Sequence, residues 1–324
     1  MPGFTSRRDF LQTAGALAGL ASLTRADDAP VYDGEIVDTH VHLWDLKAWR
    51  LPWVETATGH ARDVLAHDHG LAEFAEATRG LKVHRAVYME VDVAESDQVK
   101  EAEDVTRLCA AGGSPLRAAV ISGRPASGRF GDYLDHFRGN AWIKGVRQVL
   151  HSGATPPGYC LNPAFVRGVR LLGERGLSFD LCLRGDQLDE GARLIEQCPG
   201  TRFVLDHCGN PHAGSVDRDG WQKGLARIAN LKDRDVVCKV SGLYGNVQAA
   251  DWPAERLAPI VRAVIDAFGW DRVMFAGDWP VVNLGGSYRI WVETLKQIVQ
   301  KDSPANQARL FRDNALRFYR LAQD

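Results

Sequence analysis

The sequence predicts an α/β protein with the architecture of a TIM barrel, a (β/α)8 fold, in a single domain. Apolar runs typical of β-strands alternate with runs of helical periodicity, and this alternation occurs eight times along the chain. The chain has 324 residues, which suits one barrel of about 250 residues with insertions. It contains no internal repeat and no low-complexity linker, so we expect no second folded domain.

Eight short apolar runs, each bounded by polar segments, indicate buried strands. In chain order they are Ile36–Trp44, Arg85–Val91, Leu116–Ser122, Ile143–Leu150, Leu177–Leu183, Arg202–His207, Val236–Ser241 and Arg272–Ala276.

Between and after these runs, apolar residues recur at spacings of three and four, as expected for helices that pack along one face. The predicted helices are Leu71–Ala77, Gln98–Cys109, Phe130–Arg138, Pro163–Glu174, Leu188–Cys198, Trp221–Leu231, Trp252–Phe268, Tyr288–Gln300 and Ser303–Leu321. The last begins with Ser303 and Pro304, a typical N-cap followed by proline at the first helical position. The segment Trp44–Asp68 predicts an unusually long loop after the first strand.

The N-terminal residues resemble an export signal rather than part of the fold. The run Ser6–Leu11 contains the pair Arg7 and Arg8, and a weakly apolar stretch, Thr13–Leu23, follows it. This pattern is typical of a twin-arginine (Tat) signal, with cleavage expected after Ala26. We therefore assign residues 1–26 to the signal and 27–324 to the barrel, and expect a periplasmic or extracellular protein. An ordinary disordered or helical N-terminus is the alternative.

Composition argues for a small-molecule substrate. The formal net charge is −2, with acidic and basic residues interspersed, so the sequence offers no basic stripe for nucleic acid and no cationic amphipathic helix for a membrane surface. The six cysteines form no CxxC pair and are too sparse for a disulfide scaffold. Because twin-arginine substrates fold before export, we expect buried free thiols.

Polar side chains stand at the carboxyl ends of five predicted strands, where (β/α)8 barrels place their chemistry. His40 and His42 are spaced i and i+2, so both imidazoles project to the same side of the first strand. The other ends carry the acidic pair Glu90 and Asp92, then Arg147, His207 and Asp278. Imidazole is a common metal ligand and a ready acid or base, so the sequence predicts a site at this rim.

Five motifs at these positions resemble the amidohydrolase superfamily. They are Asp38-Thr-His40-Val-His42-Leu-Trp44, Gly145-Val-Arg147, Leu205-Asp-His207-Cys-Gly209-Asn-Pro211, Lys239-Val-Ser241-Gly-Leu243 and Gly277-Asp278-Trp279-Pro-Val281. The most similar branch is that of the sugar-acid and related lactonases, which includes L-fuconolactonases, L-rhamnonolactonases and 2-pyrone-4,6-dicarboxylate lactonases. The resemblance implies a barrel hydrolase in which His40, His42, His207 and Asp278 converge.

The chain departs from the dinuclear members of that superfamily. Those members carry a bridging lysine or glutamate on strand four and histidines on strands five and six. Here the fifth strand offers Asp180 and Cys182 but no histidine, and the fourth offers Lys144 and Arg147. The resemblance therefore leaves two alternatives. His40, His42, His207 and Asp278 hold one divalent ion, zinc or manganese, or the site works without metal.

The mechanism that these residues suggest is attack of water on a lactone carbonyl. Asp278 serves as general base, while His40, His42 and His207, or an ion that they hold, polarise the carbonyl. Four further residues are predicted to bind substrate: Arg147 through its planar fork of donors, Trp44 and Trp279 through apolar faces, and Glu90. Plain packing of the tryptophans and a structural ion pair for Glu90 are the alternatives.

Two other functions remain open from the sequence. One is a metal-dependent non-oxidative decarboxylase of an aromatic acid, a reaction found in the same superfamily. The other is a non-catalytic periplasmic binding protein, although pure binding does not need so many titratable groups at one focus.

Three further residues receive structural interpretations. His67 and His69 lead into a helical stretch, so we expect a solvated helix start there. Lys239 is a substrate or structural contact inside the barrel.

Overall fold

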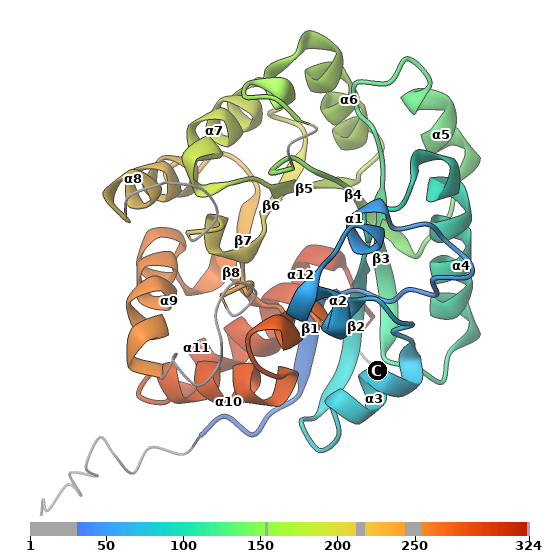
Figure 1. Cartoon of the computed structure of the whole chain (residues 1–324). Helices are drawn as coiled ribbons and strands as arrows, with labels where there is room; N and C mark the ends of the chain where they lie inside the picture. The colour runs from blue at the N-terminus through green and yellow to red at the C-terminus, as the bar shows by residue number, and fades with distance from the viewer. Residues whose placement is uncertain (1–30, 153–154, 212–217, 244–253, 323–324) are drawn as a thin grey trace, which may run out of the picture. The chain divides into compact units, whose positions relative to one another are not determined.

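Eight parallel strands form the centre of the molecule in the computed structural model, which describes residues 31–152, 155–211, 218–243 and 254–322. Each strand pairs with the next one along the chain, in the order β1 to β8. Figure 1 shows the strands grouped at the centre with helices around them. The strands are β1 (Ile36–Val41), β2 (Val83–Met89), β3 (Leu116–Ser122), β4 (Ile143–Val149), β5 (Ser178–Cys182), β6 (Arg202–Leu205), β7 (Val236–Val240) and β8 (Val273–Phe275).

The barrel closes between β1 and the segment that follows β8. The backbone N–H of Asp278 donates to the carbonyl of His40 at 2.9 Å, and that of His42 donates to the carbonyl of Trp279 at 2.8 Å. The predicted single-domain (β/α)8 barrel is therefore confirmed. The proposed signal, residues 1–26, lies outside the described residues.

The helices follow the strands in sequence. They are α1 (Pro52–Glu55), α2 (Gly59–Leu65), α3 (Leu71–Ala77), α4 (Gln98–Ala111), α5 (Phe130–His136), α6 (Pro163–Glu174), α7 (Leu188–Gln197), α8 (Arg218–Ala229), α9 (Ala254–Phe268), α10 (Tyr288–Ile298), α11 (Pro304–Ala308) and α12 (Asn314–Tyr319). Ser303 caps α11 by accepting a bond from the N–H of Asn306. Within the described ranges, no helix combines the length and apolar character needed to cross a membrane.

The loop after β1 and the last helix differ from their predicted form. The long loop after β1 contains the short helices α1 and α2, because its apolar residues Trp49, Leu51 and Val54 are buried. The single helix predicted over Ser303–Leu321 is interrupted by a π-helical turn, Arg309–Asp313, between α11 and α12.

The predicted solvated helix start is wrong for His69. This side chain is buried, and backbone bonds to Trp44 in both directions tie it to the end of β1. Its ring packs edge-on against Trp44 and Trp279. His67, by contrast, is exposed.

A pairing irregularity in β1 sets the direction of its histidines. Asp38 pairs with Ala86 and Val41 pairs with Tyr88, so three steps along β1 oppose two along β2. The extra residue has the effect of a β-bulge, which shifts the alternation of side chains beyond it. Val37 before the irregularity lies in the apolar interior of the barrel, and His40 within the irregular stretch also faces inward.

Apolar residues fill the barrel towards the end where the strands begin. Polar groups occupy the end where the strands finish. The interior cluster contains Val37, Val87, Met89, Ala118, Val120, Val204, Val237 and Met274, together with Phe318 and Tyr319 of α12. Arg202, at the start of β6, donates to the carbonyl of Phe318, which places α12 at the end where the strands begin. All six cysteines are buried free thiols, as the sequence predicts.

Glu101 of α4 fixes the end of β2, from which the acidic pair projects. Its Oε1 accepts bonds from the Val91 N–H and the Tyr88 hydroxyl, each at 2.9 Å. Burial, with the nearby charge of Glu90, raises the pKa of Glu101 to about 8 from an ordinary 4.5. The folded protein therefore keeps a proton that the unfolded chain has already released, and stability falls as the pH rises through this window.

We expect Glu101→Gln to remove this dependence. The amide is neutral at every pH and its oxygen can accept the same two bonds. Urea unfolding should show similar stability for the variant and the parent at pH 5, and a variant more stable by about 2 kcal/mol or more at pH 8. Glu174→Gln, at an exposed site on α6, is the control. Parallel stability profiles of the Glu101 variant and the parent would contradict the assignment.

Candidate active site

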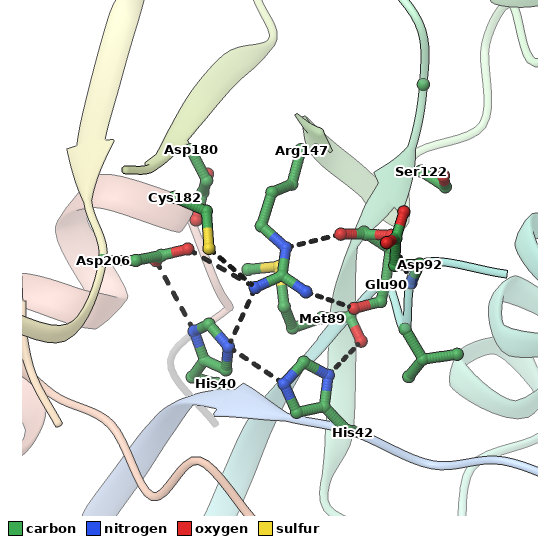
Figure 2. A network of polar contacts seen from close by, with 12 residues as sticks. His40, His42, Met89, Glu90, Asp92, Ser122, Arg147, Asp180, Cys182 and Asp206 are labelled. Atoms are coloured by element: carbon green, nitrogen blue, oxygen red, sulfur yellow. Dashed lines mark hydrogen bonds and ion pairs between the residues drawn. The ribbon is translucent and has the colours of Figure 1, made fainter. Parts of the chain in front are cut away.

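Buried polar side chains fill the barrel at the carboxyl ends of the strands. His40, Asp206 and Glu90 are fully buried, and His42 and Asp278 are about 5% exposed or less. Figure 2 shows His40 of β1 and His42, the residue directly after β1, next to each other, with Arg147 above them between Glu90 and Asp206. The strand-end residues predicted from sequence therefore meet in one place.

His40, His42 and Asp278 form a compact triad. The Nε2 atoms of the two histidines are 3.2 Å apart. Asp278 Oδ1 lies 3.7 Å from Nε2 of His40 and 3.5 Å from Nε2 of His42. On its other side, the His42 ring directs Nδ1 to the Met89 carbonyl at 3.0 Å. A carbonyl only accepts, so Nδ1 of His42 carries the proton and its Nε2 presents a lone pair to the triad.

His207 stands beside this triad. Its Nδ1 lies 3.0 Å from the Ser241 hydroxyl and 3.9 Å from Asp278 Oδ2. His207 and Asp278 both have positive φ, 52° and 57°, an uncommon conformation for residues with a Cβ. Both residues lie beyond the last residue of their strands, so the turn conformation, and not strand alternation, aims them at the site.

Arg147 and Glu90 are engaged with each other. Nε of Arg147 donates to Glu90 Oε1 at 2.6 Å, and Nη2 donates to the Glu90 backbone carbonyl at 2.7 Å. Nη1 faces His40 Nε2 at 3.4 Å and Asp206 Oδ2 at 3.6 Å. The structural ion pair that the sequence analysis gave as the alternative for Glu90 is therefore present. Substrate binding by Arg147 or Glu90 stays a prediction.

The two predicted substrate-binding tryptophans are buried. Trp44 and Trp279 are each 2% exposed, and the Trp44 indole donates to the His67 carbonyl at 2.7 Å. Trp279 packs against His69 and Phe74. This placement corresponds to the packing alternative, and substrate contact by either ring stays a prediction.

Lys239 on β7 lies inside the barrel as a structural contact, one of the two roles that the sequence analysis gave it. Sequence reasoning missed the charge cluster that it forms with Asp180 on β5 and Asp206 after β6. The Lys239 ammonium donates to Asp180 Oδ2 at 2.6 Å and pairs with Asp206 Oδ1 at 3.1 Å. It also lies 3.4 Å from His40 Nδ1, and all three side chains are fully buried. The available signal was a charged residue within or directly after an apolar run, as in Phe179-Asp180-Leu181, Val204-Leu205-Asp206 and Cys238-Lys239-Val240.

The pKa directions follow burial and pairing. Burial, with the charge of Lys239, pushes the pKa of His40 well below its ordinary value, so the ring is neutral. Burial alone would raise the pKa of Asp206, but Lys239 and His40 outweigh it and hold that pKa well below normal. Burial raises the pKa of Asp180 to about 6 despite Lys239. Burial also lowers the pKa of His207.

The family follows from a comparison with known proteins. The amidohydrolase family model matches residues 37–321, from the second residue of β1 to two residues beyond α12. The chain belongs to the amidohydrolase family. The resemblance inferred from the five motifs is thereby confirmed.

Relatives of this amidohydrolase include a lactonase. L-fucono-1,5-lactonase of Burkholderia multivorans is 29% identical over 310 residues, covering 89% of this chain and 96% of the relative. Uncharacterized protein y4mH of Sinorhizobium fredii is 30% identical over 301 residues, covering 89% and 99%. Together with the family, the lactonase relative supports a hydrolase.

A solved structure shows the same fold. It is an amidohydrolase from Burkholderia multivorans with bound zinc, with a TM-score of 0.78 and 24% identity, covering 89% of this chain and all of that one. At this identity the likeness shows the fold.

The triad of this amidohydrolase fits one divalent ion. In a tetrahedral zinc site, ligand nitrogens and oxygens about 2.0–2.2 Å from the metal lie roughly 3.4 Å from one another. The three separations within the triad are 3.2, 3.5 and 3.7 Å. The donor set of two imidazoles and a carboxylate also suits zinc or manganese. His40, His42 and Asp278 therefore match one face of such a site.

A second group of candidate ligands does not offer the same fit. His40, Asp206 and His207 also lie close together, but the Lys239 ammonium already pairs with Asp206 and approaches His40. A metal cation there would meet a fixed positive charge. Of the four residues predicted to bind metal, His40, His42 and Asp278 thus have the spacing of one face of a tetrahedral site. His207 lies beside them.

The Asp38 carboxylate fixes β1, which carries His40, against the segment that carries Asp278. One oxygen accepts the N–H groups of His40 at 3.0 Å and Gly277 at 2.8 Å, and the other accepts the Tyr288 hydroxyl at 2.8 Å. This fully buried carboxylate thus joins β1 to the segment that carries Asp278. A Cβ on Gly277 would overlap both the Asp38 carboxylate and the Tyr288 ring.

Gly277→Ala should therefore disturb fold and site together. We expect a loss of about 1–3 kcal/mol in the free energy of unfolding, measured by urea denaturation, with lower activity because Asp278 is the next residue. Gly200→Ala is the matched control, since nothing lies within 4 Å of the added Cβ at that position. Equal stability of the two variants would refute the steric argument.

Proposed function

We propose that this amidohydrolase is a lactonase that hydrolyses a small-molecule lactone, either of a sugar acid or of a related carboxylic acid. The single observation that carries the proposal is the convergence of Asp278 with His40, His42 and His207 at the rim. The L-fucono-1,5-lactonase relative, matched over 89% of this chain, supports the choice of substrate class.

Asp278 is suited to the role of general base. Its Oδ1 faces His40 and His42, while Oδ2 faces His207. The carboxylate takes a proton from water as the water oxygen attacks the lactone carbonyl carbon. The ring C–O bond then breaks, and Asp278 returns the proton to the departing alkoxide, which gives a hydroxy acid. General base catalysis of this kind contributes about 10²–10⁴-fold.

The histidines supply the electrophilic side of the reaction. His40, His42 and Asp278 would hold one divalent ion, which when bound polarises the carbonyl. His207, whose Nδ1 is satisfied by Ser241 at 3.0 Å, stands where it can donate from Nε2 to the developing oxyanion. The buried Arg147–Glu90 pair keeps both residues fixed behind the histidines.

A lactone panel tests the proposal. Aldonolactones and pyrone carboxylates are supplied to metal-analysed protein, with and without chelator, and acid release is followed with a pH indicator. We expect hydrolysis of at least one lactone, and Asp278→Asn should lower kcat by about 10²–10⁴-fold because the base is lost. Asp266→Asn, at an exposed site on α9, is the control.

Each alternative predicts a different result from the panel. Near-normal turnover by Asp278→Asn would reject the base assignment. Chelator-sensitive decarboxylation of an aromatic acid with no lactone hydrolysis would favour the decarboxylase. Calorimetric binding without turnover would favour a binding protein.

We also propose export by the twin-arginine route, which rests on Arg7, Arg8 and the apolar stretch after them. Mass spectrometry of protein from the native host should find the mature chain outside the cytoplasm, beginning at Asp27. Replacing both arginines by lysine should retain the chain inside, because the signal is read through that pair. An intact N-terminus on the cytoplasmic protein would contradict the proposal.

A further inference from the structure

Each nitrogen of the His40 ring faces one hydrogen-bond donor and one acceptor. Nδ1 lies 3.4 Å from the Lys239 ammonium and 3.5 Å from Asp206 Oδ1. Nε2 lies 3.4 Å from Nη1 of Arg147 and 3.2 Å from Nε2 of His42. A neutral imidazole carries one proton, so either of its two tautomers finds a partner on both sides.

The state without metal favours the proton on Nε2 of His40. His42 presents a bare Nε2, because its Nδ1 donates to the Met89 carbonyl. Two bare nitrogens at 3.2 Å would repel each other, whereas a proton on His40 Nε2 makes the contact a hydrogen bond. Nδ1 is then bare and accepts from Lys239.

A bound ion requires the other tautomer. The ion takes the lone pair of His40 Nε2, so the ring proton must move to Nδ1, where Asp206 accepts it. Carboxylates that receive the second N–H of a metal-bound histidine commonly orient the ring and strengthen metal binding. The proton moves from one ring nitrogen to the other, and the charge of the ring does not change.

We propose that Asp206 and Lys239 are positioning residues that set the tautomer of His40 and thereby the metal affinity of the triad. Asp206 stabilises the tautomer that binds the ion, and Lys239 stabilises the tautomer that hydrogen-bonds His42 instead. The inference rests on the one-ion site of the proposed function, but its readouts are metal affinity and a ring proton, not lactone hydrolysis.

Asp180 provides a control matched in charge. Asp180 and Asp206 are both fully buried and both pair with Lys239, but His40 contacts Asp206. Zinc affinity is measured by competition with a chromogenic chelator at pH 8. We expect Asp206→Asn to weaken binding about 10–100-fold, and Asp180→Asn to weaken it by clearly less. Equal losses would show a general charge effect and overturn the proposal.

Removal of the Lys239 ammonium tests the other half of the proposal, because its expected effect on zinc affinity is opposite to that of Asp206→Asn. The double variant Lys239→Met with Asp180→Asn removes one charge of each sign, so the net charge of the cluster stays the same and no carboxylate of that pair is left alone. We expect tighter zinc binding than in the parent. The His40 tautomer that the metal-free protein favours, with a bare Nδ1, has lost the Lys239 ammonium that donates to it. A purely structural role of Lys239 predicts unchanged or weaker zinc binding, and either result would overturn the proposal.

A measurement on the unmodified protein needs no variant to fold. Two-bond ¹⁵N–¹H correlation spectra of histidine-labelled, metal-free protein report which ring nitrogen carries the proton. We expect the proton of His40 on Nε2 before zinc is added and on Nδ1 afterwards. A proton on Nδ1 in the metal-free protein would overturn the proposal, whatever the enzyme hydrolyses.

Discussion

The closure of the barrel between β1 and the segment after β8 is the constraint on which the site depends. The same two backbone hydrogen bonds that close the sheet join His40 to Asp278 and His42 to Trp279. The residues of the triad are thus fixed by main-chain pairing, and the Asp38 carboxylate joins the same two segments through the N–H groups of His40 and Gly277. A site built in this way is preorganised, because its side chains cannot separate without opening the barrel.

Burial of many charges behind that joint requires that they compensate one another. An isolated ion in a protein interior is costly, and paired ions with satisfied hydrogen bonds are tolerated. Here Arg147 is paired with Glu90, and Lys239 with Asp180 and Asp206. Both cations are thus engaged by carboxylates, which leaves His40, His42 and Asp278 as the group that can accept a metal ion or a polarised substrate.

Function and fold make opposite demands on the same backbone at the strand ends. His207 and Asp278 adopt positive φ, a conformation that costs energy for a residue with a side chain. The surrounding structure stabilises both turns, through Ser241 against His207 and through the closure bonds at Asp278. The family model and the L-fucono-1,5-lactonase relative support a hydrolase for the chain as a whole.

The sequence by itself determined the barrel, its eight strands and the histidine pair at the end of β1, because apolar periodicity and strand alternation are local properties. It also identified Asp278 and His207 through their motifs. Tertiary structure decided the rest: Arg147 meets a carboxylate 57 residues away, and Lys239 meets one 59 residues away. Periodicity carries no information on such distant partners. The burial of Trp44 and Trp279, and the bulge that turns His40 inward, likewise depend on packing and pairing that exist only once the barrel has closed.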